Sequence, residues 1–295
     1  MSTPKTSILM TELSVNDNAF NAVISEIKSN SESSIPQPVM IIGQSGAGKT
    51  TLLKRIYESD KCEGKSKVWI NGRTIFCSQD IISKIENPRN SILFIDDIDF
   101  FLTRCSYEEQ FRLRNFLYNE GAPMMISTVS KILPALTEYE APFFEGLKTI
   151  YIDAISSDNI NKLFNKQETR RADILMNLLP PTIRSLLTVY SIIKLNKFPE
   201  KDISILISMF SEKYNDLYNR LPPYSQHILN ALGTINEGMI IPEIRGSTGL
   251  QTNILTAYLN SLKNNGIINI DKSKKKNARY SIKDPLFKSW INTTL

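Results

Sequence analysis

Hydrophobic positions in the first half of the chain form short runs that alternate with stretches of helical spacing between residues 38 and 153. This alternation is typical of buried parallel strands joined by helices. The predicted strands are 38–42, 67–70, 91–95, 124–128 and 149–152. Residues 14–29 place apolar side chains at helical spacing and predict a helix ahead of the first strand. The pattern therefore predicts an α/β domain built on a parallel sheet.

The pattern changes after Asp153 to helical spacing alone, which predicts a helical lid over 157–166, 169–178, 181–194 and 199–217. A third module begins near Pro222. Its predicted elements are helices over 223–234, 241–246 and 250–264, two short strands over 267–270 and 279–282, and a closing helix in DPLFKSWI. We therefore expect three domains: an α/β domain over 1–155, a lid over 156–217 and a helix-turn-helix module with a two-stranded wing over 218–295.

Composition is that of an ordinary globular protein, with 41% hydrophobic and 22% charged residues among 295. The N-terminus lacks a long apolar run behind a basic start, so a cytoplasmic location is expected. The three cysteines lack the spacing of a zinc site or a disulfide framework. Residues 263–288 carry a net charge of +6 against +5 for the whole chain, which indicates either a polyanion partner or a solvated lysine-rich loop.

A glycine-rich motif joins the first predicted strand to a helix and fits the pattern G-x-x-x-x-G-K-[ST]. Backbone N–H groups of such a loop surround phosphates, its lysine reaches the β and γ oxygens, and its hydroxyl ligates Mg²⁺. The sequence therefore predicts a nucleoside triphosphate site, with ATP and Mg²⁺ as ligands. The expected contacts are Gly43, Gln44, Ser45, Gly46, Ala47, Gly48, Lys49, Thr50 and Thr51.

Polar residues end two later strands. Asp96 and Asp97 follow the strand at 91–95, where Asp96 is expected to hold Mg²⁺ and Asp97 to orient or deprotonate the attacking water. A pair of adjacent carboxylates can also cap a helix. Ser127 and Thr128 end the strand at 124–128, at the sheet edge where ligands bind, and either is a candidate contact for the γ-phosphate or the water. The alternative is a plain strand end.

At these motifs the chain resembles the AAA+ ATPases, most closely the branch of replication initiators, origin-recognition proteins and archaeal-type ATPases with a C-terminal winged helix. The resemblance covers roughly residues 15–290. It implies that Gly43–Thr50 is Walker A, that Ile92–Asp97 is Walker B, and that Ser127 or Thr128 is sensor 1. It also implies sensor 2 in PPTIRSLL, with Arg184 aimed at the γ-phosphate; the alternative for Arg184 is a surface arginine.

One departure concerns the arginine that many relatives place near APFFEGLKTIYI, where this chain has only Lys148. Arg104, Arg170 or Arg171 could act in its place, so self-association of the AAA+ module stays an open expectation. The absence of an [NT]KxD motif disfavours a GTPase, and the absence of an LSGGQ-like segment disfavours a transporter-type ATPase. A small-molecule kinase stays possible but leaves the C-terminal module unexplained.

The C-terminal module is expected to bind DNA. Helix-turn-helix modules place their later helix in the major groove, which makes residues near the start of helix 250–264 candidate contacts. The candidates are Gln251, Thr252, Asn253 and Thr256 on that helix, with Lys274, Lys275, Lys276 and Arg279 in the wing. Helix 250–264 holds one basic residue, Lys263, and winged helices also bind proteins. The favoured function is thus an ATP-driven switch acting on DNA, and the alternative is a nucleotide-gated scaffold whose winged module binds a protein partner.

Overall fold

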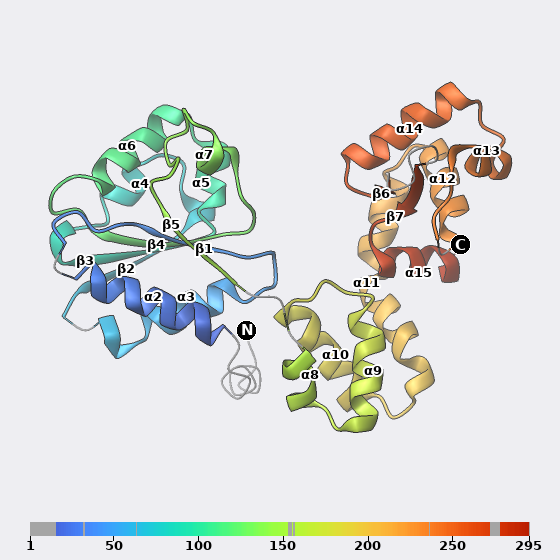
Figure 1. Ribbon diagram of the computed structural model, residues 1–295, viewed down its shortest axis with the longest axis horizontal. Helices are drawn as coiled ribbons and strands as arrows, with labels where there is room; N and C mark the ends of the chain where they lie inside the picture. The colour runs from blue at the N-terminus through green and yellow to red at the C-terminus, as the bar shows by residue number, and fades with distance from the viewer. Residues whose placement is uncertain are drawn as a thin grey trace. The chain divides into compact units, whose positions relative to one another are not determined.

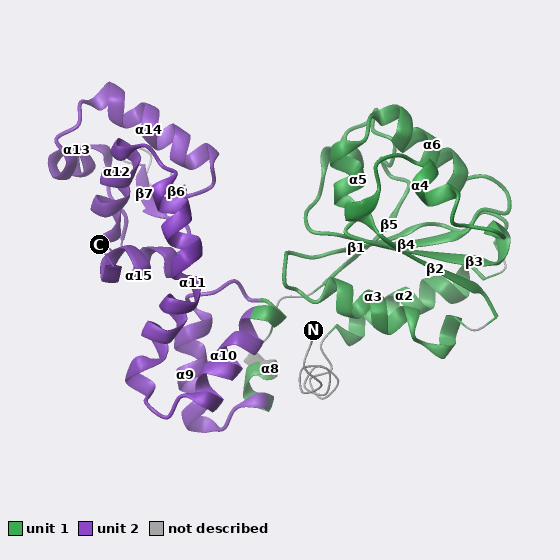
Figure 2. Cartoon of the chain, turned by 180° about the vertical axis from the view of Figure 1, so that it is seen from behind, with its two compact units in different colours: residues 1–162, 182–184 green, residues 163–181, 185–295 purple. Residues whose placement is uncertain are grey.

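A computed structural model describes residues 16–31, 33–62, 64–152, 155, 157–235, 237–271 and 278–294. The chain divides into two compact units (Figure 2). The first consists of residues 1–162 with 182–184, and the second of residues 163–181 with 185–295. None of the helices in the described ranges combines the length and apolarity that a membrane span needs.

The first unit is built on a five-stranded parallel sheet in the order β2-β3-β4-β1-β5. The strands are β1 (Val39–Ile42), β2 (Ser66–Asn71), β3 (Ser91–Asp96), β4 (Met124–Val129) and β5 (Lys148–Tyr151). The predicted parallel sheet is confirmed, each strand within two residues of its expected bounds. The order adds something that the sequence did not indicate, because β4 lies between β1 and β3.

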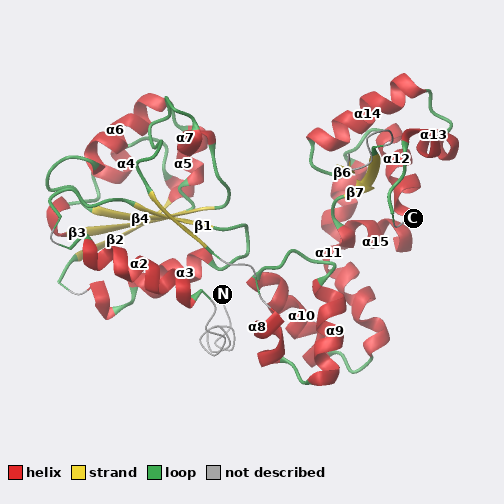
Figure 3. Cartoon of the chain, viewed as in Figure 1, coloured by secondary structure: helices red, strands yellow, loops and turns green. Residues whose placement is uncertain are grey.

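Helices cover both faces of this sheet, as Figures 1 and 3 show. One face carries α2 (Asp17–Ser29) and α3 (Lys49–Tyr57). The other carries α4 (Gln79–Ile82), α5 (Asp99–Arg104), α6 (Tyr107–Leu117) and α7 (Pro134–Thr137). Because strand side chains alternate, Val39 and Ile41 join the core on the α2 and α3 side, whereas Met40 and Ile42 join the other core. Buried strands of this kind have no polar face, which explains their continuous apolar runs.

Short 3₁₀ helices complete the connections of the first unit. These are η1 (Asp60–Cys62), η2 (Gly72–Thr74) and η3 (Pro88–Asn90). The helix α8 (Ser157–Leu163) follows β5 along the chain.

The second unit contains α9 (Lys166–Met176), η4 (Pro199–Lys201), α11 (Asp202–Asn219) and, from Ser185 onward, α10 (Ile183–Leu195). The helix α9 begins three residues before its predicted start. Its N-cap is Asn165, whose side chain accepts from the backbone N–H of Glu168 while the Glu168 carboxylate accepts from the Asn165 N–H. This capping box satisfies orphan donors of the first turn and fixes the start of the helix.

The rest of the second unit is α12 (Pro223–Gly233), α13 (Ile241–Thr248), α14 (Thr252–Asn264), β6 (Ile268–Asp271), β7 (Arg279–Ile282) and α15 (Pro285–Thr294). The strands β6 and β7 form an antiparallel hairpin. An aromatic cluster joins α15 to α11, in which the buried Trp290 lies against Tyr214 and Tyr218. The element order is the one expected of a winged helix, and that assignment stays a prediction.

An ion pair links the helices of the lid. Arg171 donates from Nε and Nη2 to the two carboxylate oxygens of Asp202, at 2.7 and 2.8 Å. Asn196 Nδ2 donates to the same carboxylate at 2.7 Å. Burial alone raises the pKa of Asp202, but the hydrogen bonds from Arg171 and Asn196 outweigh it and hold that pKa below its usual range. The buried Asp202 therefore stays ionised and fixes α9 against the start of α11.

Replacing Asp202 with Ala should lower the free energy of unfolding by about 3 kcal/mol, because the mostly buried Arg171 guanidinium loses its carboxylate. Urea unfolding followed by circular dichroism measures the loss. A depressed folded-state pKa means that this stabilisation is present above about pH 4 and disappears as the pH falls through the folded pKa. The gap between wild type and variant should therefore narrow in acid.

Asp216→Ala on the same helix is the matched control. Asp216 is exposed and lies 4.0 Å from Arg220, so its loss should change stability by less than about 0.5 kcal/mol. Equal losses in the two variants would contradict the role given to the Arg171–Asp202 pair.

Candidate functional site

The order of the strands brings three polar strand ends together at one edge of the sheet. In a parallel sheet all the carboxyl ends meet at the same edge. Because β4 lies between β1 and β3, its end at Thr128 separates the glycine-rich loop after β1 from Asp96 at the end of β3. The predicted nucleotide residues of three separate segments are therefore neighbours in space.

The glycine-rich loop turns sharply between β1 and α3. Gly46 and Gly48 have φ angles of 86° and 92°, in the left-handed region that favours glycine. Lys49 begins α3, and its ammonium donates to the carbonyls of Gly43 at 2.8 Å and Gln44 at 3.2 Å. The loop therefore curves around the lysine side chain, which is 6% exposed.

Opposing effects act on the charge of Lys49. Burial lowers the pKa of its ammonium, and the charge of Arg184 lowers it further. The carboxylates of Asp97, Asp99 and Asp96 raise it. The effect of burial is the largest, and the pKa stays below its usual value.

Asp99 was not predicted as a site residue. Its Oδ2 accepts the Ser130 N–H at 3.4 Å, and its Oδ1 is buried with no hydrogen-bond partner among the described residues.

Asp96 connects the glycine-rich loop to the neighbouring strand. Its Oδ2 accepts the Thr50 hydroxyl at 2.8 Å and its Oδ1 accepts the Thr128 hydroxyl at 2.7 Å. A hydroxyl and a carboxylate are oxygen donors of the kind that Mg²⁺ prefers. The described residues contain no cluster of three acidic, histidine or cysteine side chains that could hold a metal unaided. The donor set fits an ion that keeps water and phosphate oxygens as its other ligands.

Asp97 adopts a backbone conformation that is uncommon outside glycine, with φ at 57°. Its N–H donates to the Thr128 hydroxyl at 2.8 Å, which helps to hold this turn. Its carboxylate accepts from Arg73 Nε at 3.1 Å. Arg73 lies in η2, at the end of β2, and its guanidinium stacks on Phe100 at 4.6 Å. The predicted base is therefore held from one side by an arginine that the motifs did not indicate.

Gly72 explains how these segments fit together. A Cβ at this position would lie 2.6 Å from the carbonyl carbon of Asp97 and 2.9 Å from the carbonyl oxygen of Asp96. The backbone of η2 can approach the two aspartates this closely because residue 72 has no side chain. One sequence signal could have indicated Gly72 and Arg73, since they come one residue after the end of the predicted strand 67–70, at the same sheet edge.

The two hydroxyls at the end of β4 have different surroundings. Thr128 contacts both Asp96 and the backbone of Asp97. Ser127 is fully buried, and its hydroxyl donates to the Val39 carbonyl of β1 at 3.3 Å. Of the two predicted candidates, Thr128 is the one that the structure places against the aspartates.

The segment Thr182–Arg184 belongs to the first unit and lies on the glycine-rich loop. The Arg184 N–H donates to the Gly46 carbonyl at 3.1 Å. A Cβ on Gly48 would come within 2.6 Å of the Ile183 side chain. On the same loop Asn16 Nδ2 donates to the Ala47 carbonyl at 3.2 Å. Arg184 is thus anchored beside the loop through its backbone, with an exposed side chain whose charge acts on Lys49.

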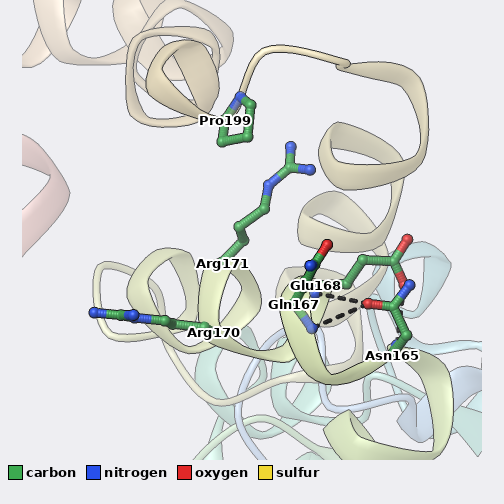
Figure 4. Close-up of a pocket in the computed structure, with 6 residues that line it drawn as sticks. All are labelled: Asn165, Gln167, Glu168, Arg170, Arg171 and Pro199. Carbon is green, nitrogen blue, oxygen red and sulfur yellow. Dashed lines mark hydrogen bonds between the residues drawn. The ribbon is translucent and has the colours of Figure 1, made fainter.

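A hollow of about 490 Å³ lies in the second unit (Figure 4). Its lining residues are Asn165, Gln167, Glu168, Arg170, Arg171 and Pro199. Arg171 is bound to Asp202, and Glu168 both caps α9 and pairs with Lys194 at 2.7 Å. Arg170 is exposed.

Arg104, the third arginine considered as a finger, lies in the first unit, where its guanidinium stacks on Phe100 at 4.7 Å. Of the three arginines considered as a finger, two thus have contacts within their own unit.

The predicted DNA contacts differ in exposure and in the contacts that they make. Gln251, Thr252 and Asn253 are exposed at the start of α14. Lys274, Lys275 and Lys276 lie outside the described residues. Arg279 donates from Nη1 to the Gly238 carbonyl at 2.8 Å and lies 4.0 Å from the Glu243 carboxylate, so it anchors the hairpin to the segment before α13.

Comparisons with known proteins found similarities in sequence and in fold. Residues 7–110, which hold the glycine-rich loop and the two aspartates, match the model of a family described as novel STAND NTPase 5. Aeropyrum pernix ORC1, solved in complex with DNA, is similar with a TM-score of 0.55 and 11% identity, over 94% of this chain and 92% of that one. The chain has a P-loop NTPase fold, and that fold is similar to the fold of ORC1.

Two further solved structures are similar. Drosophila ORC bound to DNA has a TM-score of 0.49 at 11% identity, over 99% of this chain and 92% of that chain. Aquifex aeolicus DnaA bound to AMPPCP has a TM-score of 0.49 at 16% identity, over 85% and 88%. A search of curated protein sequences found no match. At these identities the similarity concerns the fold alone.

Gly72→Ala should destabilise the first unit by about 2 kcal/mol, because the added methyl group forces η2 away from the backbone of Asp96 and Asp97. Thermal unfolding measures the change. Gly246→Ala is the matched control, since Gly246 is an exposed position of α13 and its added Cβ meets nothing within 4 Å. That variant should be stabilised by about 0.5–1 kcal/mol. A neutral Gly72→Ala would show that the close approach is not required.

Proposed function

We propose that the chain is a switch that binds ATP with Mg²⁺ at the edge formed by β1, β4 and β3, hydrolyses it slowly or on demand, and acts on DNA through residues 218–295. The proposal of an ATP and Mg²⁺ site rests on one observation: the Asp96 carboxylate accepts hydrogen bonds from the hydroxyls of both Thr50 and Thr128. A carboxylate bound to a hydroxyl in the first turn of a helix, next to a buried lysine at the start of that helix, is typical of a site that binds phosphate and a metal ion.

Each residue has a role that follows from its position. Lys49 releases the carbonyls of Gly43 and Gln44 and donates to the β and γ phosphate oxygens, while the loop N–H groups hold the remaining oxygens. Thr50 and Asp96 hold Mg²⁺, which neutralises charge on the phosphates. Asp97 accepts a proton from the attacking water, and Thr128 fixes the turn that aims it. Arg184 supplies positive charge beside the loop.

The ion pair with Arg73 bears on the rate. The guanidinium of Arg73 lies 3.1 Å from Asp97 Oδ2, so this contact engages one carboxylate oxygen that the attacking water would otherwise reach. A conformational change that moves η2 would release it. This supports slow basal hydrolysis, as expected of a switch.

DNA is proposed as the partner for two reasons. Aeropyrum pernix ORC1, whose fold is similar with a TM-score of 0.55, was solved in complex with DNA. Residues 263–288 of this chain also carry most of its excess positive charge. The second candidate is a scaffold whose C-terminal module binds a protein. It is favoured by one observation, that Lys263 is the single basic residue of α14. Self-association through the AAA+ module and a cytoplasmic location stay predictions.

Lys49→Ala should weaken ATP binding by at least about 100-fold, since hydrogen bonds from a charged donor contribute about 1.5–3 kcal/mol each. Titration with a fluorescent ATP analogue measures the affinity. Lys54→Ala changes an exposed lysine of the same helix and should bind as the wild type does. Unchanged affinity in a folded Lys49→Ala protein would remove the loop as the nucleotide site.

Asp97→Asn should keep ATP affinity within about threefold and lower kcat by at least ~100-fold, because an amide cannot accept the proton of the attacking water. Phosphate release under saturating ATP measures kcat. Asp96→Asn should instead weaken the Mg²⁺-dependent part of binding. Wild-type turnover by Asp97→Asn would assign the base to another group.

Replacing Lys274, Lys275 and Lys276 together with Ala should weaken binding about equally on unrelated duplexes, as expected of phosphate contacts. The slope of log K against log salt should fall in magnitude by up to ~2.7. Fluorescence anisotropy at several salt concentrations measures both, and intact ATP binding controls for misfolding. If affinity and slope are unchanged, the protein-binding alternative becomes the better explanation.

A further inference from the structure

The exposed surface of α14 carries amides in a regular row. Leu255, Leu259 and Leu262 are buried and attach the helix to its module. On the exposed surface Asn253, Asn260 and Asn264 are separated by seven and four residues, a spacing that places them on one face. Figure 1 shows α14 at the outer edge of its module. We call these three residues the amide row.

The amide row is not used by the fold. All three side chains are exposed, and none has a hydrogen bond or ion pair within the part of the chain that the structure describes. Thr256 differs, because its hydroxyl donates to the Thr252 carbonyl of its own helix at 2.8 Å. Each amide of the row therefore keeps a free donor and a free acceptor on the same planar group.

The chemistry of the row favours one kind of base pair. In the major groove an asparagine pairs in bidentate fashion with N6 and N7 of adenine, and an alanine methyl contacts the methyl group of thymine. Guanine is read by arginine or lysine, and cytosine by carboxylates. The exposed residues between the ends of the row include Ala257. The helix α14 contains no arginine, aspartate or glutamate, and its one lysine, Lys263, lies in its last turn.

The length of the row is also suitable. From Asn253 to Asn264 the helix rises by about 16 Å at ~1.5 Å per residue. That distance corresponds to about five base pairs at ~3.4 Å each. A major groove about 12 Å wide admits a single helix, and an exposed helix anchored by three leucines on its far side can enter it.

We propose that the amide row reads A·T base pairs of duplex DNA in the major groove, with Asn253, Asn260 and Asn264 as the specificity-determining residues. The inference rests on the proposed DNA-binding function and deepens it. It also explains the shortage of positive charge on α14, because base contacts need no charge when the phosphate contacts come from other residues.

The first experiment compares wild-type binding to duplexes of equal length, one with an A·T core, one with a G·C core, and one whose A·T core carries 7-deazaadenine. The modified base lacks the N7 acceptor of the major groove and leaves the minor groove unchanged. We expect A·T to bind about 5- to 150-fold more tightly than G·C per amide pair formed, the range that 1–3 kcal/mol represents. The 7-deazaadenine duplex should lose most of this preference.

The second experiment uses Asn260→Ala and Asn260→Arg, with Asn215→Ala on the exposed surface of α11 as the control. Asn260→Ala should lower affinity for the A·T duplex, leave the G·C duplex unaffected and keep the salt slope of the wild type. Asn260→Arg should shift preference toward G·C, because arginine pairs with guanine. Asn215→Ala should change nothing.

The outcomes separate this inference from the proposed function. Salt-dependent binding with equal affinity for A·T and G·C would overturn the amide row and leave DNA binding in place. A preference that survives 7-deazaadenine or Asn260→Ala would overturn it as well, since groove shape would then be the cause. Failure to bind any duplex would overturn both, and capture of a protein partner by the same face would support the scaffold alternative.

Discussion

The Asp96 carboxylate is the group on which the candidate nucleotide site depends. Its two oxygens accept hydroxyls from the first turn of α3 and from the end of β4, so one side chain fixes the glycine-rich loop, β4 and β3 relative to each other. The Asp96 carboxylate and the Thr50 hydroxyl are thereby held 2.8 Å apart, and oxygen atoms of this kind are the ligands that Mg²⁺ prefers. The same contacts that fix the geometry therefore prepare the chemistry.

Asp97 depends on a different set of constraints. A left-handed φ at a residue other than glycine is unfavourable and persists where surrounding contacts determine it. Three contacts do so here: the Thr128 hydroxyl at its N–H, the backbone of Gly72 against its carbonyl, and the Arg73 guanidinium at its carboxylate. Two of these come from the end of β2, an edge strand. The position of the proposed base is thus controlled by the segment after β2, which the nucleotide motifs do not include.

The sequence predicted the parts of the structure that depend on local pattern. Buried parallel strands are continuous apolar runs, and the glycine-rich loop has fixed spacing, so both could be located without tertiary information. The choice between Ser127 and Thr128 could not be made, because adjacent strand residues face opposite sides and the pleat is known only from pairing with β1 and β3. Arg73 was missed because its partner Asp97 is 24 positions away in the sequence. The fixed role of Arg279 was missed because the Gly238 carbonyl that it contacts is 41 positions away.

The contrast between α14 and the wing indicates how binding and specificity would be divided. Positive charge near the end of the chain attracts any phosphate backbone and falls in effect as salt rises. Neutral amides contribute little to that attraction, yet each presents one donor and one acceptor in a fixed plane, and an incorrect base leaves both unpaired. If α14 carried the lysines itself, sequence preference and non-specific affinity would rise together. Separating a helix with a single lysine from a basic segment that follows it would allow the protein to bind any duplex weakly and to bind more tightly where the base edges match.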